Sequence, residues 1–383
     1  MNCLVYLPHS YTGRGPAESC VRIIEHFASQ GIETTVFVQR ARAQLPQSVA
    51  AVDSGGRLLR KLPFKLVSPF TKRLLRRAFR AAVDSAEPGT IAYFWPNTPA
   101  DLVSYAKAKG MVCVREMINS PLAHAKPVLD EAYRAAGVQP THGLTQAMVD
   151  RENAELALHD FIFSSNAEVD AALLALGVAR DRILSSTFGW TASRFAPNTA
   201  PTMSDDTTRF RAVFVGLMNV RKGISTLLEA WEMAAVDGEL IMAGAPEPCL
   251  QPMIDDACSK PGVRHLGFVS DVASLYRSCD VFVFPTFEEG GPQVTYEAAA
   301  CGIPVITTPM GAARLIEHDV TGMIVAAGDT HALAEALRKL AMDKPLRRSL
   351  SIKAREKVDQ FEYRAVGTER AQLLLNVARL LRP

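Results

Sequence analysis

The chain has 383 residues, of which 48% are hydrophobic and 21% charged, and its formal net charge is only +2. This length suits two domains, and the charge balance argues against a nucleic-acid binder held by bulk charge. No stretch approaches the 18 uninterrupted apolar residues of a membrane-spanning helix. Residues 1–6 predict a strand rather than a signal peptide, and seven cysteines without a CxxC pair favour reduced thiols in a cytoplasmic protein.

Strands and helices alternate through the first half of the chain. Residues 3–7 predict a strand, 8–15 a polar loop with glycines, and 16–29 a helix that ends before Gly31. Further strands are expected at 34–38, 91–94, 112–114, 161–164 and 183–185. Such alternation predicts a mostly parallel sheet covered by helices on both faces.

A polar, proline-bearing stretch at 196–208 interrupts this pattern and predicts a linker between domains 1–195 and 209–362. Strands are then expected at 211–215, 240–243, 263–266, 281–284 and 305–307, and helices at 224–235, 273–278, 293–301, 331–342, 345–358 and 363–381. The chain is therefore expected to be α/β, with two Rossmann-like domains.

The segment 281–325 holds two glutamates eight residues apart. Glu289 follows an expected strand, and Glu297 lies in the next expected helix. Because ligands of open α/β sheets bind outside the carboxyl ends of strands, both acids can face one crevice. The loop Gly290, Gly291 and Pro292 would let a ligand approach the backbone, and the helix start favours an anion. Carboxylates suit sugar and ribose hydroxyls, although an isolated pair of glutamates would more often be a helix cap and a solvated residue.

This segment resembles the E-x7-E motif of retaining GT-B glycosyltransferases, notably glycosyltransferase family 4. The similarity continues through Ala298, Gly302, Pro304, Val305, Gly311 and 319–322, and more loosely over the whole chain. It implies the GT-B fold, in which two Rossmann-like domains face a central cleft and a C-terminal helix, here 363–383, packs back on the first domain. It also implies that Glu289 contacts the donor sugar and that Glu297 binds the ribose hydroxyls.

A second motif, residues 214–223, contains adjacent basic residues. The family commonly places an arginine directly after the glycine that Gly216 matches, and a lysine five residues later, and both neutralise the donor diphosphate. Lys222 matches the lysine, but Leu217 occupies the arginine position, so Arg221 is expected to supply the second charge. The plainer alternative is a solvated basic loop.

Other donor-side candidates come from the same resemblance. The loop at Gly244 and the loop 267–271, which contains Val269, would line the base pocket, and Gln293 and Val294 would lie beside the donor at the helix start. The Gly291–Pro292 pair replaces the commoner Phe-Gly, so a differently shaped sugar pocket is expected.

The first expected loop contains Gly13 and Gly15, which in the family reach towards the donor phosphates and the acceptor. A structural role for this glycine pair remains open. Glu18 stands where a Rossmann dehydrogenase needs its third glycine, so NAD binding is disfavoured.

Four residues are acceptor-side candidates. Glu116 and Asn119 follow an expected strand and would point at the cleft, whereas His9 and His124 are lone histidines, which more often have a structural role.

Residues 57–80 contain nine Lys or Arg and no acid, interleaved with apolar residues. This pattern fits docking on an anionic membrane surface, at the inner face of the cell membrane, and fits equally a helix with a solvated basic face. Pro63 and Pro69 argue against one long helix.

The implied function is retaining transfer of a sugar from a nucleoside diphosphate sugar to a hydroxyl of a glycan or lipid-linked acceptor, in bacterial polysaccharide or glycolipid biosynthesis. The sequence has no Asp-x-Asp pair, so we expect Arg221 and Lys222 to stabilise the leaving group without a metal or cofactor. A nucleotide-sugar 2-epimerase, a sugar phosphorylase and a non-catalytic GT-B-like partner subunit remain alternatives.

Overall fold

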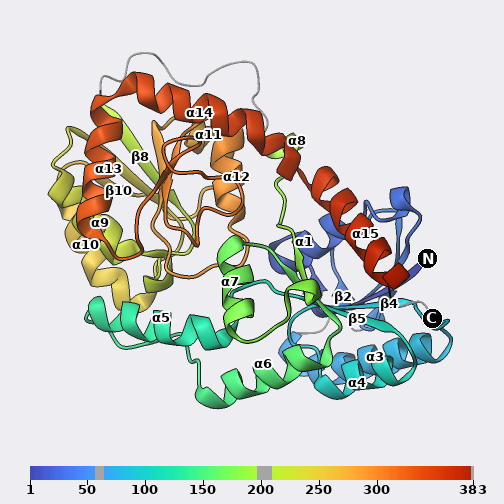
Figure 1. Ribbon diagram of the computed structural model, residues 1–383. Helices are drawn as coiled ribbons and strands as arrows, with labels where there is room; N and C mark the ends of the chain where they lie inside the picture. Colours follow the sequence, from blue (N-terminus) through green and yellow to red (C-terminus); the bar gives the residue numbers. More distant parts are fainter. Residues whose placement is uncertain (57–63, 196–208, 381–383) are drawn as a thin grey trace.

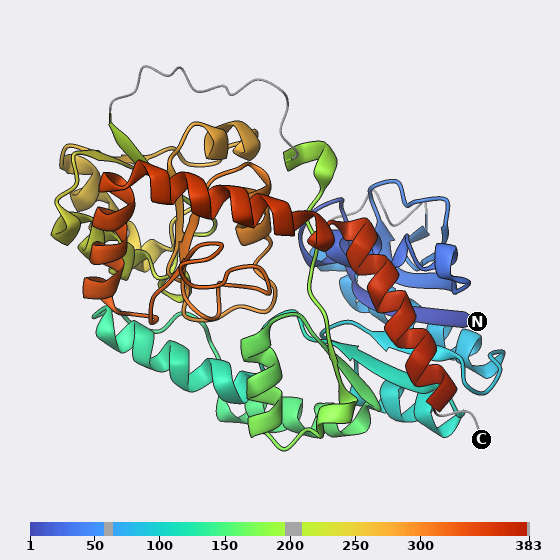
Figure 2. The same cartoon turned by 45° about the horizontal axis from the view of Figure 1, so that its top comes forward.

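The computed structural model describes residues 1–56, 64–195 and 209–380. The predicted linker 196–208 lies outside the described residues, as do 57–63 and 381–383. The chain forms two lobes, each built on a parallel sheet, and both termini lie at the lobe that holds the first sheet (Figures 1 and 2). This arrangement confirms the α/β class and the two Rossmann-like units.

The first sheet has seven strands in the order β3-β2-β1-β4-β5-β6-β7. Its strands are β1 (Asn2–Tyr11), β2 (Glu33–Ala41), β3 (Val49–Asp53), β4 (Ile91–Phe94), β5 (Val112–Glu116), β6 (Phe161–Ser164) and β7 (Ile183–Ser185). The helices are α1 (Gly15–Ile24), α3 (Phe64–Asp84), α4 (Ala100–Ala108), α5 (Leu122–Ala135), α6 (Gln146–Leu158), α7 (Ala167–Ala175) and α8 (Ala192–Phe195).

Helices cover both faces of this sheet, as the alternation predicts. On one face, α1 buries Cys20, Val21 and Ile24 against the core. On the other, Leu75, Phe79 and Val83 of α3 are spaced four residues apart and form one buried stripe.

The second sheet has the order β10-β9-β8-β11-β12-β13. Its strands are β8 (Phe210–Val215), β9 (Gly238–Ala243), β10 (Val263–His265), β11 (Val281–Phe284), β12 (Val305–Thr307) and β13 (Met323–Ile324). Its helices are α9 (Ile224–Ala234), α10 (Gln251–Ser259), α11 (Val272–Arg277), α12 (Gln293–Ala300), α13 (Thr330–Met342) and α14 (Lys344–Val358). Gly302, with φ +80°, ends α12 in a left-handed conformation, as its sequence position predicts.

The last helix, α15 (Tyr363–Leu380), leaves the second lobe and packs on α1 of the first (Figure 2). A side chain at Gly367 would place its Cβ 2.6 Å from the carbonyl oxygen of Ile23, so only glycine allows this close helix crossing. The fully buried Arg370 extends from α15 into the first sheet.

Three sequence predictions differ from the structure. The strand β1 continues through residues 8–11, which were expected to form a loop, and its register against β2 shifts between Leu7 and Ser10. The edge strand β3 was missed because it is short and half exposed. Pro69 does not interrupt α3, since it lies near the helix start and removes one backbone hydrogen bond there.

Candidate functional site

In each sheet the strand order reverses at one point, between β1 and β4 in the first and between β8 and β11 in the second. Such switch points form crevices at the carboxyl ends of the strands, where α/β proteins bind ligands. The segment after β8 leads to Lys222, and the segment after β11 leads to Glu289. The two sequence motifs therefore meet at the second switch point.

Arg221, Lys222 and Glu289 form one charged cluster. The Lys222 ammonium donates a short hydrogen bond to Glu289 Oε1, and Arg221 Nη1 lies 3.4 Å from the same oxygen. Thr286 also donates its hydroxyl to this carboxylate, at 3.3 Å. Burial, together with the charge of Arg221, lowers the pKa of Lys222 well below its usual range, while Glu288 acts in the opposite direction. A bound anion beside Lys222 would counteract this lowering of the pKa, because a nearby negative charge favours the protonated amine.

Glu288, which the sequence analysis did not single out, connects this cluster to the first lobe. Its carboxylate accepts hydrogen bonds from the backbone N–H and the hydroxyl of Ser120, each at 2.9 Å, and lies 3.3 Å from Arg221 Nη1. Only 2% of Glu288 is exposed. The two adjacent glutamates after β11, Glu288 and Glu289, were the sequence signal for this residue. Only their tertiary contacts show that Glu288 bonds to the first lobe and Glu289 to Lys222.

The two glycines after Glu289 pack against residues of the first lobe. A Cβ on Gly290 would lie 2.0 Å from the carbonyl oxygen of Ile118, and one on Gly291 would lie 2.3 Å from the ring of Phe188. The expectation that these glycines admit a ligand therefore needs correction in this structure. They let the first lobe approach the loop, and the neighbouring Pro292 is buried.

The start of α12 is also engaged with the first lobe. The Gln293 amide donates to the Gly189 carbonyl at 2.9 Å and contacts Ser19 at 3.5 Å. It also bonds to the Tyr363 hydroxyl. Thus Gln293, expected at the donor, acts here as a bridge between lobes, and Val294 packs at the edge of the second core. No side chain caps α12, so its first N–H groups remain suited to an anion.

Glu297 lies on α12, apart from the Lys222 cluster. It is half buried, and burial raises the pKa of its carboxyl to about 7, although the charge of Arg194 lowers it in part. Within the described part of the chain, no hydrogen bond to its carboxyl group occurs. Its acceptor oxygens are therefore available to hydroxyl donors.

Glycines line the carboxyl ends of β8, β9 and β10. A Cβ on Gly244 would lie 1.8 Å from the carbonyl oxygen of Gly216, and the Gly244 N–H donates to the carbonyl of Gly267 at 2.8 Å. Val269 is half buried in the next loop, whereas its neighbour Phe268 is 81% exposed. Phe268 belongs to the loop that the family resemblance assigns to the base pocket, and its ring is an exposed aromatic surface there.

The acceptor-side candidates separate in the structure. Glu116 is fully buried, and Arg370 Nη1 lies 2.6 Å from its Oε2, so its assignment to the acceptor side was wrong. Asn119 is exposed, with its backbone nitrogen 2.6 Å from the position of a Cβ on Gly290. His124 lies in the first turn of α5, a helix that packs against the short helix holding Arg221 and Lys222.

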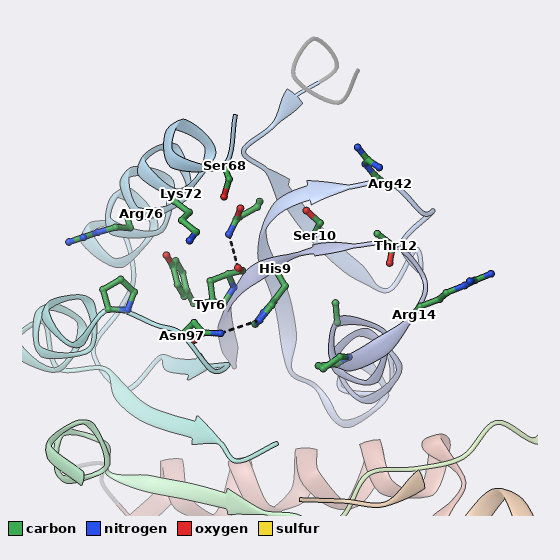
Figure 3. A pocket seen from close by; sticks show the side chains of 15 residues that line it. Tyr6, His9, Ser10, Thr12, Arg14, Arg42, Ser68, Lys72, Arg76 and Asn97 are labelled. Carbon is green, nitrogen blue, oxygen red and sulfur yellow. Dashed lines mark hydrogen bonds between the residues drawn. The ribbon is translucent and has the colours of Figure 1, made fainter. Parts of the chain in front are cut away.

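His9 belongs to a different hollow, at the first switch point. This cavity of about 770 Å³ lies between α1 and α3, and Figure 3 shows His9 beside Asn97 within it. Their Nε2 and Nδ2 atoms are 3.5 Å apart. The nearby Gly13 and Gly15 have φ values of +73° and +67°, a conformation that favours glycine at the start of α1.

The basic stretch lies on α3, and the part of it at 57–63 falls outside the described residues. Val67, Leu75 and Phe79 are buried, so these apolar side chains are not free to enter a membrane. Phe70, at 56% exposed, and the basic side chains form the outer face. No helix within the described ranges is long and apolar enough to span a membrane.

Comparison with known proteins agrees with this geometry. Residues 209–343 match the family model described as "Glycosyl transferases group 1". The capsular polysaccharide biosynthesis glycosyltransferase CapM of Staphylococcus aureus is 35% identical over 155 residues, which cover 38% of this chain and 40% of CapM. N-acetyl-alpha-D-glucosaminyl L-malate synthase of Bacillus anthracis is 28% identical over 44% of this chain and 46% of its own. The chain thus spans less than half the length of these relatives.

Solved structures resemble the whole chain. Sucrose-phosphate synthase of Thermosynechococcus elongatus has a TM-score of 0.75 at 18% identity and covers 99% of both chains. HepE of Anabaena, in complex with UDP and glucose, has a TM-score of 0.70 at 16% identity, covering 98% of this chain and 100% of HepE. The chain therefore has the GT-B fold, and its residues 209–343 match the model of the group 1 glycosyl transferases, the family that its E-x7-E motif resembles.

Proposed function

We propose that this protein is a retaining glycosyltransferase that moves a sugar from a nucleoside diphosphate sugar to an acceptor hydroxyl in bacterial polysaccharide or glycolipid biosynthesis. The observation that carries the proposal is the cluster of Arg221 and Lys222 on the carboxylate of Glu289 at the second switch point. CapM, a relative over part of the chain, is named for capsular polysaccharide biosynthesis.

The donor is proposed to lie across the carboxyl ends of β8 and β11. Lys222, Arg221 and the open N–H groups of α12 would stabilise the departing diphosphate, so that protein groups carry out this step without a metal. Glu289 would hold the donor sugar, and Glu297 would accept ribose hydroxyls. The fold neighbour HepE is described with UDP and glucose, which supports a nucleotide-sugar donor.

The nucleotide base is proposed to lie between the Gly216–Gly244 contact and the loop of Val269. Phe268 is exposed there and offers a surface for stacking. Retention at the anomeric carbon is proposed from the family resemblance and is read from the product by NMR.

The test is the release of nucleoside diphosphate from a panel of UDP-, GDP- and ADP-sugars, with and without candidate acceptors. Release that depends on acceptor supports transfer, whereas interconversion of sugar nucleotides without acceptor indicates an epimerase. Phosphate-dependent breakdown of a glycan indicates a phosphorylase. Calorimetry then compares diphosphate binding by the wild type and by Glu297→Ala, and a chain that binds none of the nucleotides contradicts the proposal.

We also propose that the outer face of α3 docks on the anionic inner face of the cell membrane. Arg73 and Arg77 are exposed there, and neither forms an ion pair within the part of the chain that the structure describes. Co-sedimentation with phosphatidylglycerol vesicles tests this contact. An Arg73→Glu, Arg77→Glu variant should lose binding, and unchanged sedimentation would support a merely solvated basic face.

A further inference from the structure

The hollow at the first switch point is lined by cations. Lys72 and Arg76 come from α3, Arg42 follows β2, and Arg14 precedes α1. None of the described residues that line this hollow is acidic. Arg76 is paired with Asp101 and points away in Figure 3, whereas Lys72 points inward, towards Tyr6 and His9. Lys72, Arg42 and Arg14 have no ion-pair partner within the described ranges.

The strand β1 is irregular where it borders this hollow. The register shift between Leu7 and Ser10 inserts one extra residue opposite β2, which is a β-bulge. Gln39 donates its amide to the Pro8 carbonyl at 2.6 Å inside the bulge. Bulges of this kind re-aim side chains and often lie beside functional sites. Here the bulge presents His9 to the hollow (Figure 3).

Two residues that line this hollow each have a polar side-chain atom without a partner. Among the described residues, His9 Nδ1 and Ser10 Oγ are buried without a hydrogen-bond partner. Burial, with the charge of Lys72, lowers the pKa of His9. Buried polar atoms without partners are costly in a folded protein, so a hollow that places them near the inward-pointing Lys72 suits an anionic, hydrogen-bonding ligand.

We propose that this hollow binds a phosphate group of the acceptor, with Lys72 as its main charge contact and with His9 and Ser10 as hydrogen-bonding partners. The inference rests on the proposed function and narrows the acceptor to a phosphate-bearing molecule, either a soluble sugar phosphate or a lipid-linked phosphate. Helix α1 joins the two sites, since Ala17 lines the hollow and Ser19 contacts Gln293 at the start of α12.

The experiment compares Lys72→Ala with Arg73→Ala. Both residues are exposed cations on α3, and both line a second hollow on its outer side, but only Lys72 lines the hollow at the first switch point. Each variant therefore loses the same charge. Calorimetry with inorganic pyrophosphate and with glucose 6-phosphate, with glucose as the neutral control, measures the binding.

We expect Lys72→Ala to weaken the binding of both phosphate probes by about tenfold, and Arg73→Ala by less than about twofold. Anion binding at the donor site is common to both variants and cancels in the comparison. Equal affinities of the two variants, or equal binding of glucose and glucose 6-phosphate, would overturn the inference.

The source of the phosphate is separated with phosphatidylcholine vesicles that carry phosphatidic acid. A lipid source predicts that Lys72→Ala weakens vesicle binding beyond the loss seen in Arg73→Ala, and a soluble source predicts that Lys72→Ala loses no more vesicle binding than Arg73→Ala. The calorimetric and vesicle-binding measurements do not require sugar transfer. If phosphate binding depends on Lys72 but no sugar is transferred, the phosphate site is supported and the proposed function is rejected. If sugar is transferred to an acceptor without phosphate and Lys72→Ala does not affect this transfer, the proposed function is supported and the phosphate site is rejected.

Discussion

The carboxylate of Glu288, in the second lobe, accepts two hydrogen bonds from Ser120 of the first lobe, both at 2.9 Å. The same carboxylate lies 3.3 Å from Arg221 Nη1, one residue from Lys222. The side chain of Glu288 therefore links one contact between the lobes to the orientation of a proposed catalytic cation.

Removing this contact should affect turnover more than folding. In Ser120→Ala, Glu288 keeps the backbone N–H of residue 120, so we expect a loss of about 1 kcal/mol in the free energy of unfolding. In Glu288→Ala, Arg221 also loses one of its two carboxylate partners, and kcat should fall further than in Ser120→Ala. Urea unfolding and steady-state kinetics of the two variants provide the measurement. Equal kcat values would show that Glu288 does not position Arg221.

Lys222→Ala should lower kcat by about 10²- to 10³-fold, because a preorganised charge at the leaving group is lost. Lys260→Ala, which removes an exposed lysine of the same lobe, is the control. Binding of the nucleoside diphosphate followed by calorimetry separates a loss of affinity from a loss of turnover. Full activity of Lys222→Ala would remove this residue from the mechanism.

The relation between Leu217 and Arg221 can be tested by a swap. Leu217 is 52% exposed and occupies the place where the family commonly has arginine. We expect Arg221→Ala to weaken diphosphate binding and Leu217→Arg in that background to restore part of it, since guanidinium binds phosphate bidentately. No recovery in the double variant would mean that the two positions do not serve the same phosphate.

Glu297 should make stability depend on pH in an unusual direction. Burial raises the pKa of its carboxyl from 4.5 to about 7, so the folded protein favours the neutral acid. Its contribution to stability is full below about pH 4.5 and is lost as the pH rises through 7. Relative to Glu297→Gln, the wild type should therefore lose about 2–3 kcal/mol between pH 5 and 8. Urea unfolding at both pH values measures this difference, and Glu335→Gln on the exposed face of α13 is the control. If the free energy of unfolding changed with pH by the same amount in the wild type and in Glu297→Gln, this prediction would be contradicted.

The pair of Glu116 and Arg370 should be important for stability. Both side chains are fully buried, so Arg370→Met leaves a buried carboxylate and should cost about 3–5 kcal/mol. The double variant Glu116→Leu, Arg370→Met removes both charges and should recover much of this loss. Thermal unfolding of the single and double variants checks it. A loss of acceptor binding at unchanged stability in Glu116→Gln would instead return this residue to the acceptor site.

Hydrophobic periodicity determined most of the secondary structure. Strands at 91–94, 161–164, 183–185, 281–284 and 305–307 have the bounds expected from their apolar runs, since strands buried on both faces need continuous apolar sequence. The approach of Arg221, Lys222 and Glu289 to one crevice was also expected, because carboxyl ends of parallel strands converge at a switch point, but their direct pairing was not.

Tertiary structure alone decided which polar residues face a ligand and which hold the lobes together. Glu116 ends β5 and Asn119 follows it, yet one is buried against Arg370 and the other is exposed, because α15 arrives from more than 200 residues away in the chain. Gly290 is needed for the approach of Ile118, which no local pattern records. Sequence periodicity specifies which face of an element is apolar, whereas the partner of a buried charge depends on contacts between distant segments.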